Sequence, residues 1–61
     1  MNRRDVIAAS RDLFAARSQH DLFNRLCAHL GRAPTSAELR TWVNSVFGPF
    51  HIDAELLKRC T

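Results

Sequence analysis

Residues 35–47 read TSAELRTWVNSVF, and this stretch begins with the strongest local structural signal in the sequence. Its start is a capping box, in which the Thr35 hydroxyl accepts from the N–H of Glu38 and the Glu38 carboxylate reaches back to the N–H of Thr35. Gly48 and Pro49 then stop the helix. Between these signals the large apolar residues recur at helical spacing, at Leu39, Trp42, Val43, Val46 and Phe47. The pattern predicts a capped amphipathic helix over residues 38–47.

Two more helices are predicted before this one. Residues 3–17 follow a capping Asn2 and place Val6, Ile7, Leu13 and Phe14 on one apolar face. Ser18 and Asp21 resemble a second capping box, which predicts a helix to residue 30 that ends at Gly31. The apolar stripe of this second helix contains Leu22, Phe23, Leu26, Cys27 and Leu30. No glycine or proline separates the two helices, so a single kinked helix is the alternative.

A short fourth helix is predicted over residues 53–60. Asp53 is placed to cap it, Ile52 and Leu57 have the spacing of a hydrophobic staple, and Leu56 and Leu57 are expected to dock it on the core. The predicted fold is therefore all-α, a compact bundle of three helices plus a short C-terminal fourth helix, in one helical domain over residues 1–61. A chain of this length buries a small core, so we expect marginal stability.

Charge and apolar runs limit the partners and the location of the protein. The net charge is +3, and eight of the nine basic residues are arginine, with the excess in the first half of the chain. No apolar run approaches the length of a membrane span, and no signal-peptide core follows Arg3 and Arg4. Cys27 and Cys60 are too few for a disulfide framework. We expect a cytoplasmic protein with free thiols and no membrane partner.

The residues that carry chemistry are scattered, and we expect no enzyme, no cofactor and no metal. Cys27 and His29 point to different sides of a helix because they are two residues apart, and Cys60 lies at the end of the chain. With His20 and His51 these residues form none of the usual paired spacings of a metal site. Binding is therefore the expected activity, and two kinds of partner are considered.

Residues 30–39 read LGRAPTSAEL and resemble the start of the helix-turn-helix of bacterial sigma factors, where L-G-R-x-P-T-x-x-E-L joins two helices. The resemblance implies that residues 38–47 are a supporting helix and that residues 53–60 are a recognition helix, which would enter the major groove of DNA. The proposed recognition helix opens with the carboxylates of Asp53 and Glu55, which DNA phosphates repel.

The first functional hypothesis is a small regulatory or inhibitory adaptor of the phage or plasmid accessory type, which acts through protein–protein contacts with a larger partner. Aromatic anchors beside polar residues are typical of such interfaces. Trp42 and Phe47 also have core spacing, whereas Phe50 follows a Gly-Pro stop and is expected to be exposed. A homodimer is compatible with this hypothesis. The predicted protein-binding residues are Phe50, His51, Trp42 and Phe47.

The alternative is a helix-turn-helix-like transcriptional regulator that binds DNA as a dimer. Arginine and asparagine are the side chains that read guanine and adenine. A monomer with a charge of +3 makes few phosphate contacts, so its binding would be lost in physiological salt. The predicted nucleic-acid-binding residues are Arg3, Arg4, Arg11, Arg17, Arg32, Arg40 and Asn44.

Overall fold

The capped helix predicted over residues 38–47 is present as α3, Ser36–Phe47, and both hydrogen bonds of its capping box form. The N–H of Glu38 donates to Thr35 Oγ1 at 3.1 Å, and the N–H of Thr35 donates to Glu38 Oε1 at 3.0 Å. Gly48 ends the helix with φ 95° and ψ −168°, a conformation that essentially only glycine adopts. Its N–H donates to the Asn44 carbonyl, so the last turn closes before the chain leaves the helix.

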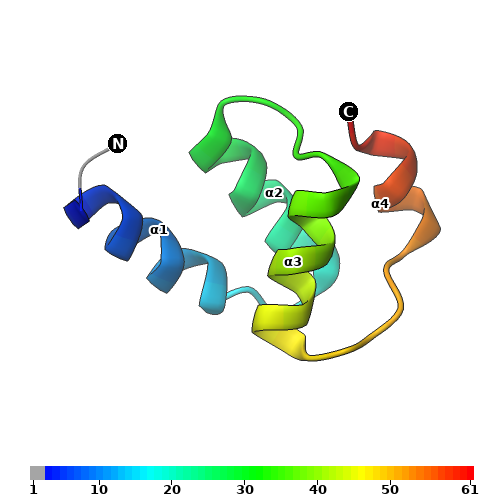
Figure 1. Ribbon diagram of the computed structural model, residues 1–61, viewed down its shortest axis with the longest axis horizontal. Helices are drawn as coiled ribbons and strands as arrows, with labels where there is room; N and C mark the ends of the chain where they lie inside the picture. The colour runs from blue at the N-terminus through cyan, green and yellow to red at the C-terminus, as the bar shows by residue number, and fades with distance from the viewer. Residues whose placement is uncertain (1–2) are drawn as a thin grey trace.

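The computed structural model describes the backbone of residues 3–61 and the side chains of residues 9–61. Over this range the chain is all-helical, with α1 (Arg3–Phe14), α2 (Gln19–Leu30), α3 and α4 (Ala54–Arg59) (Figure 1). The first three helices contact one another, and the predicted fold class is confirmed. Among the described helices none is both long and apolar enough to cross a membrane. The predictions for the Asn2 cap and for the Val6 and Ile7 side chains lie outside the described residues.

The boundary between α1 and α2 differs from the prediction. The first helix ends at Phe14 and not at residue 17, and the alternative of one kinked helix is wrong. The N–H groups of Ala15 and Ala16 donate to carbonyls three residues back, so the chain tightens into a turn instead of continuing the helix. Ser18 then caps α2 by accepting from the N–H of Asp21 at 3.0 Å, while the Asp21 carboxylate accepts from the N–H of Arg17.

A small apolar core joins all four helices. Phe14, predicted on the core face of the first helix, is instead 54% exposed and lies edge-on to Trp42 with ring centroids 6.2 Å apart. The preceding residue, Leu13, faces the core instead. Because α1 ends at Phe14, no further helical turn covers the Phe14 ring. The buried apolar residues are Leu13, Ala16, Leu22, Phe23, Leu26, Leu39, Val43 and Leu56.

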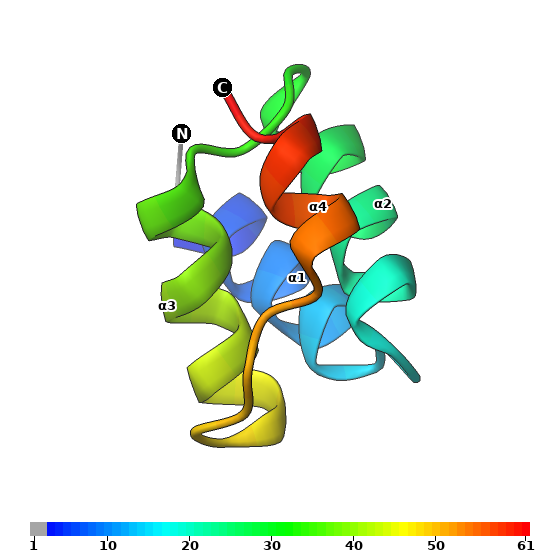
Figure 2. The same cartoon turned by 90° about the vertical axis from the view of Figure 1, so that its right-hand side faces the viewer.

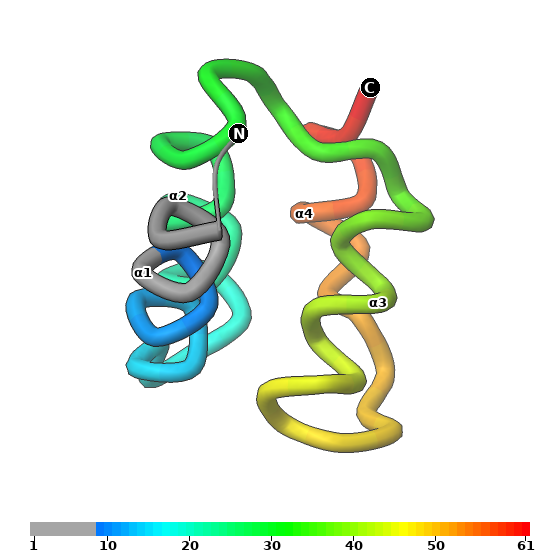
Figure 3. The backbone as a smooth tube through the Cα atoms, turned by 60° about the vertical axis from the view of Figure 1, so that its left-hand side comes forward, coloured from blue at the N-terminus to red at the C-terminus, as the bar shows by residue number. Residues whose placement is uncertain are grey.

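The chain after α3 runs back along that helix and ends near the α2–α3 turn (Figures 2 and 3). The N–H of Thr61 donates to the Pro34 carbonyl at 3.1 Å, and this hydrogen bond holds the C-terminal end of the chain against the α2–α3 turn. α4 docks through Leu56, which is 1% exposed, whereas Leu57 is 37% exposed. The prediction that both leucines dock is therefore wrong for Leu57, because adjacent helical residues point about 100° apart and one short helix presents one face to the core.

Candidate functional site

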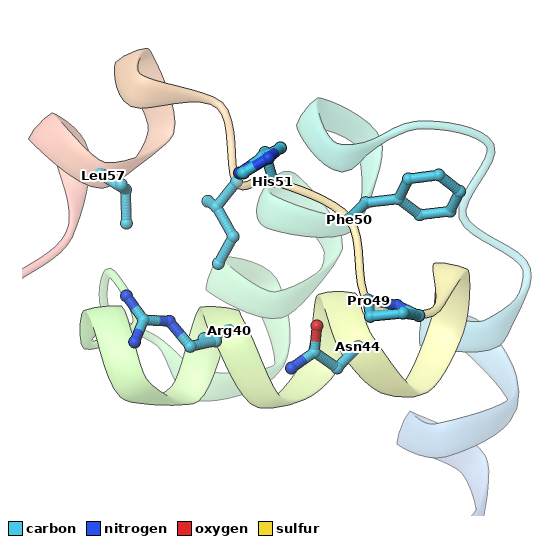
Figure 4. Close-up of a pocket in the computed structure, with 7 residues that line it drawn as sticks. Arg40, Asn44, Pro49, Phe50, His51 and Leu57 are labelled. Carbon is cyan, nitrogen blue, oxygen red and sulfur yellow. The ribbon is translucent and has the colours of Figure 1, made fainter.

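A groove lies between α3, the segment over residues 49–52 and α4, with a volume of about 410 Å³ (Figure 4). Arg40 and Asn44 rise from α3 into it, and the Arg40 side chain extends toward the end where Leu57 lies. The Phe50 ring projects away from the opposite end. The lining residues are Arg40, Asn44, Pro49, Phe50, His51, Ile52 and Leu57.

The far wall of the groove is held by one amide side chain of α2. Gln19 Nε2 donates to the His51 carbonyl at 2.8 Å, and Gln19 Oε1 accepts from the N–H of Asp53 at 2.8 Å. His20 Nε2 and Asp53 Oδ2 also lie 2.8 Å apart, and Asp53 caps α4 by accepting from the N–H of Glu55. These contacts fix an otherwise irregular segment against the helical core.

The four predicted protein-binding residues divide between two places. Phe50 and His51 are exposed and line the groove, and Phe50 is 62% exposed, as predicted. Trp42 and Phe47 are half-buried and pack against the core. Trp42 also lines a second, apolar pocket of about 140 Å³ between α1, α2 and α3, on a surface apart from the groove.

The predicted nucleic-acid-binding residues also divide. Arg40 and Asn44 line the same groove as Phe50, so residues from the two hypotheses meet there. Arg32 is occupied by Glu38, with contacts of 2.9 and 3.1 Å to its two carboxylate oxygens. Arg11 and Arg17 are exposed outside the groove, and the side chains of Arg3 and Arg4 lie outside the described residues.

Each side-chain carboxylate within residues 9–61 has a cationic or imidazole partner. Asp12 contacts Arg25 and His29, Asp21 contacts Arg25, and Glu38 contacts Arg32. Asp53 contacts His20 at 2.8 Å, and Glu55 has a longer contact of 3.8 Å with Lys58. Arg40 has no ion-pair partner within this range. Arg11, Arg17 and Arg59 have none in this range either, but they lie outside the groove. Among the lining residues Arg40 is the arginine, and no acidic side chain lies beside it.

Hydrogen bonds to the charged form lower the pKa of four carboxylates, those of Asp12, Asp21, Glu38 and Asp53. The Arg32 guanidinium, with the N–H of Thr35, lowers the pKa of Glu38 to about 2. The His29 hydrogen bond and Arg25 lower the pKa of Asp12, and the N–H of Arg17 with Arg25 lowers that of Asp21. The N–H of Glu55, with His20, lowers the pKa of Asp53. Near neutral pH all four carboxylates carry their charge and hold their partners.

The remaining chemistry-bearing residues do not gather into a centre. Cys27 and Cys60 are free and half-buried, and burial raises the pKa of the Cys60 thiol. Within the described side chains, no three of the histidine, cysteine, aspartate and glutamate residues lie close enough together to hold a metal ion.

Two features that build the groove were not predicted from the sequence. They are the hydrogen bonds between the Gln19 side chain and the backbone of residues 51 and 53, and the exposure of Leu57. Gln19 lies in the first turn of α2, and no local pattern signals that its amide reaches residues 51 and 53. Leu57 has the spacing of a staple, but only the docking of α4 decides which of two adjacent leucines faces inward. The stop at Gly48 was the available signal that the following segment leaves α3 with Phe50 exposed.

No protein-family model, curated protein or solved structure matches the chain. The resemblance of residues 30–39 to the start of a sigma-factor helix-turn-helix stays a prediction.

Proposed function

We propose that the protein is a small non-enzymatic adaptor, regulatory or inhibitory in action, that binds a segment of a larger protein in the groove between α3 and α4. The observation that carries the proposal is that exposed apolar side chains and an arginine with no ion-pair partner within residues 9–61 lie around one concave site. Leu57 is 37% exposed at the end of the groove toward which Arg40 extends, and Phe50, 62% exposed, lies at the opposite rim with its ring turned outward. An apolar anchor site with one arginine and a polar rim is typical of a binding hot spot.

The lining of the groove suits binding more than catalysis. It offers one imidazole, from His51, and no hydroxyl, thiol or carboxylate. Nucleophilic or acid–base chemistry needs a nucleophile and a second group to activate it. The volume of about 410 Å³ accommodates a few side chains of a partner segment.

DNA binding is the second candidate, and the observation that favours it is the placement of Arg40 and Asn44 one helical turn apart on the exposed side of α3. Two features weaken it. Arg32 is bound to Glu38, and the start of α4, the helix that would read bases, carries Asp53 and the exposed Glu55. These carboxylates would face DNA phosphates.

Selection from a display library of random peptides tests the proposal, with Phe50→Ala and Phe14→Ala as a matched pair of variants. Phe14 is a comparably exposed phenylalanine that lies outside the groove. We expect the wild type and Phe14→Ala to enrich a common set of peptides and Phe50→Ala to lose most of it. Absence of enrichment, or equal loss in both variants, would contradict docking in the groove. Salt-sensitive binding of labelled duplex DNA that Phe50→Ala leaves intact would favour the second candidate.

A further inference from the structure

We infer that the occupant of the groove is an acidic peptide segment, in which a carboxylate flanks an aliphatic or aromatic side chain. The inference rests on the proposed docking function and adds the chemistry of the partner. It follows from three properties of the groove: an arginine with no ion-pair partner among the side chains of residues 9–61, an apolar wall beside it, and a lining without acidic side chains.

Arg40 is the charged group that selects the partner. The other arginine beside the capping box, Arg32, already binds a carboxylate in a two-point contact, which shows the geometry that a guanidinium prefers. Arg40 is exposed and faces the groove without such a carboxylate (Figure 4). Asn44 lies one turn further along α3 and adds amide donors on the same side.

The apolar wall supplies the second half of the recognition. Leu57 is exposed at the end toward which Arg40 extends, and Pro49 lies at the opposite end, near Phe50. Ile52 also lines the groove. Burial of an aliphatic or aromatic side chain there would remove apolar surface of both partners from water. The carboxylate would then lie in a partly dehydrated site, where its contact with Arg40 is stronger than in open solvent.

Charge complementarity favours an acidic partner over a basic or neutral one. The described carboxylates are paired with cations or imidazoles at other places on the molecule, so none competes for Arg40. A basic segment would place like charges beside Arg40 and find no acidic group in the lining.

The direct test is a fluorescence-anisotropy titration with a short labelled peptide of alternating glutamate and leucine. Its two control probes replace every glutamate by glutamine or every leucine by alanine. The protein variants are Arg40→Gln and, as the matched control, Arg11→Gln at an exposed arginine outside the groove. Circular dichroism checks that both variants keep the helical signal of the wild type.

We expect the glutamate–leucine peptide to bind and both control probes to bind much more weakly. Arg40→Gln should weaken binding by about tenfold, the loss typical of one charge-assisted hydrogen-bonded contact, whereas Arg11→Gln should change it by less than about twofold. Arg40→Lys should lose part of the affinity because it keeps the charge without the planar fork. Added salt should weaken the wild type more than Arg40→Gln.

Different outcomes of these experiments would overturn the acidic partner alone or the docking function as well. Library peptides that depend on Phe50 but are neutral or basic would overturn the acidic partner and leave docking in place. No peptide enrichment at all would overturn both. Equal binding of the glutamate and glutamine probes, or equal losses in Arg40→Gln and Arg11→Gln, would also overturn the inference. So would duplex DNA that binds more tightly than the peptide and depends on Arg40.

Discussion

At the scale of single residues, Arg32 and Arg40 show how the same side chain acquires different roles. Arg32 follows the glycine that ends α2 and meets Glu38, whose carboxylate already accepts from the N–H of Thr35. That pair is part of the helix cap and stabilises the fold. Arg40 lies one residue after the buried Leu39, on the outer side of α3, and has no carboxylate to bind within residues 9–61. The first arginine is structural, and the second is available to a partner.

Glu38→Gln should reveal the contribution of the cap as a pH-dependent loss of stability. The pKa of Glu38 falls from 4.5 to about 2 on folding, so its contribution is present above pH 4.5 and is lost as the pH falls toward 2. Urea denaturation should show the variant less stable than the wild type at neutral pH, with a difference that shrinks below about pH 5 and is lost as the pH falls through about 2. A difference that is equal at pH 7 and pH 2 would show that the carboxylate charge is not its cause.

At the scale of elements, α4 and the segment before it depend on α2 more than on their own propensity. A six-residue helix is too short to be stable alone, and its burial comes mainly from Leu56. Gln19 and His20 supply the polar contacts that position residues 51–53. The wall of the groove is therefore set by tertiary contacts, which is why the sequence pattern predicted α4 but not the surface that it forms.

Gln19→Ala should loosen this wall without unfolding the core. It removes two hydrogen bonds to the backbone, a loss of about 1–2 kcal/mol of local stability. Amide hydrogen exchange should accelerate over residues 51–59 and stay slow in the buried parts of α2 and α3. Asn24→Ala, at an exposed amide on the same helix, is the matched control and should change neither region. Uniform acceleration over all helices would contradict a local role for Gln19.

The turn at Gly48 should tolerate a side chain less well than the turn at Gly31. Both glycines have positive φ and open space where a Cβ would lie, so the backbone alone decides the cost. Gly31 is in the left-handed region, where alanine costs about 1–2 kcal/mol, whereas Gly48 is in a region nearly closed to other residues, with strain up to about 3 kcal/mol. Thermal denaturation of Gly31→Ala and Gly48→Ala should show the larger loss at Gly48. The reverse order would mean that the segment after α3 relaxes easily.

At the scale of the whole molecule, periodicity and caps predicted the four helices because each is marked by local signals. The Thr35–Glu38 box, the Gly31 stop and the Asp53 cap all formed as their residue types imply. Besides the end of the first helix, the predictions that failed concern which of two adjacent residues faces inward, Leu13 or Phe14 and Leu56 or Leu57. That choice depends on the angle at which each helix meets the core, and local spacing leaves it open. The groove combines residues far apart in sequence and could not be assembled from any one motif.

The division between core and groove should appear in the stability of two variants. Leu39→Ala leaves a cavity in a small core and should cost about 2–5 kcal/mol, a large part of the stability of a domain of this size. Phe50→Ala should change the free energy of unfolding by less than about 0.5 kcal/mol because the ring is 62% exposed. Both values come from thermal and urea denaturation followed by circular dichroism. A large loss in Phe50→Ala would place that ring in the core.

A ¹⁵N–¹H NMR titration of the protein with the glutamate–leucine peptide tests most directly whether the groove between α3 and α4 is the docking site. We expect concentration-dependent shifts at the amides of residues 40, 44, 50–52 and 57, and at the Asn44 side-chain amide, with the amides around Phe14 and Arg11 unchanged. Shifts confined to α1, or no shift at peptide concentrations that saturate the anisotropy signal, would show that the groove between α3 and α4 is not the docking site.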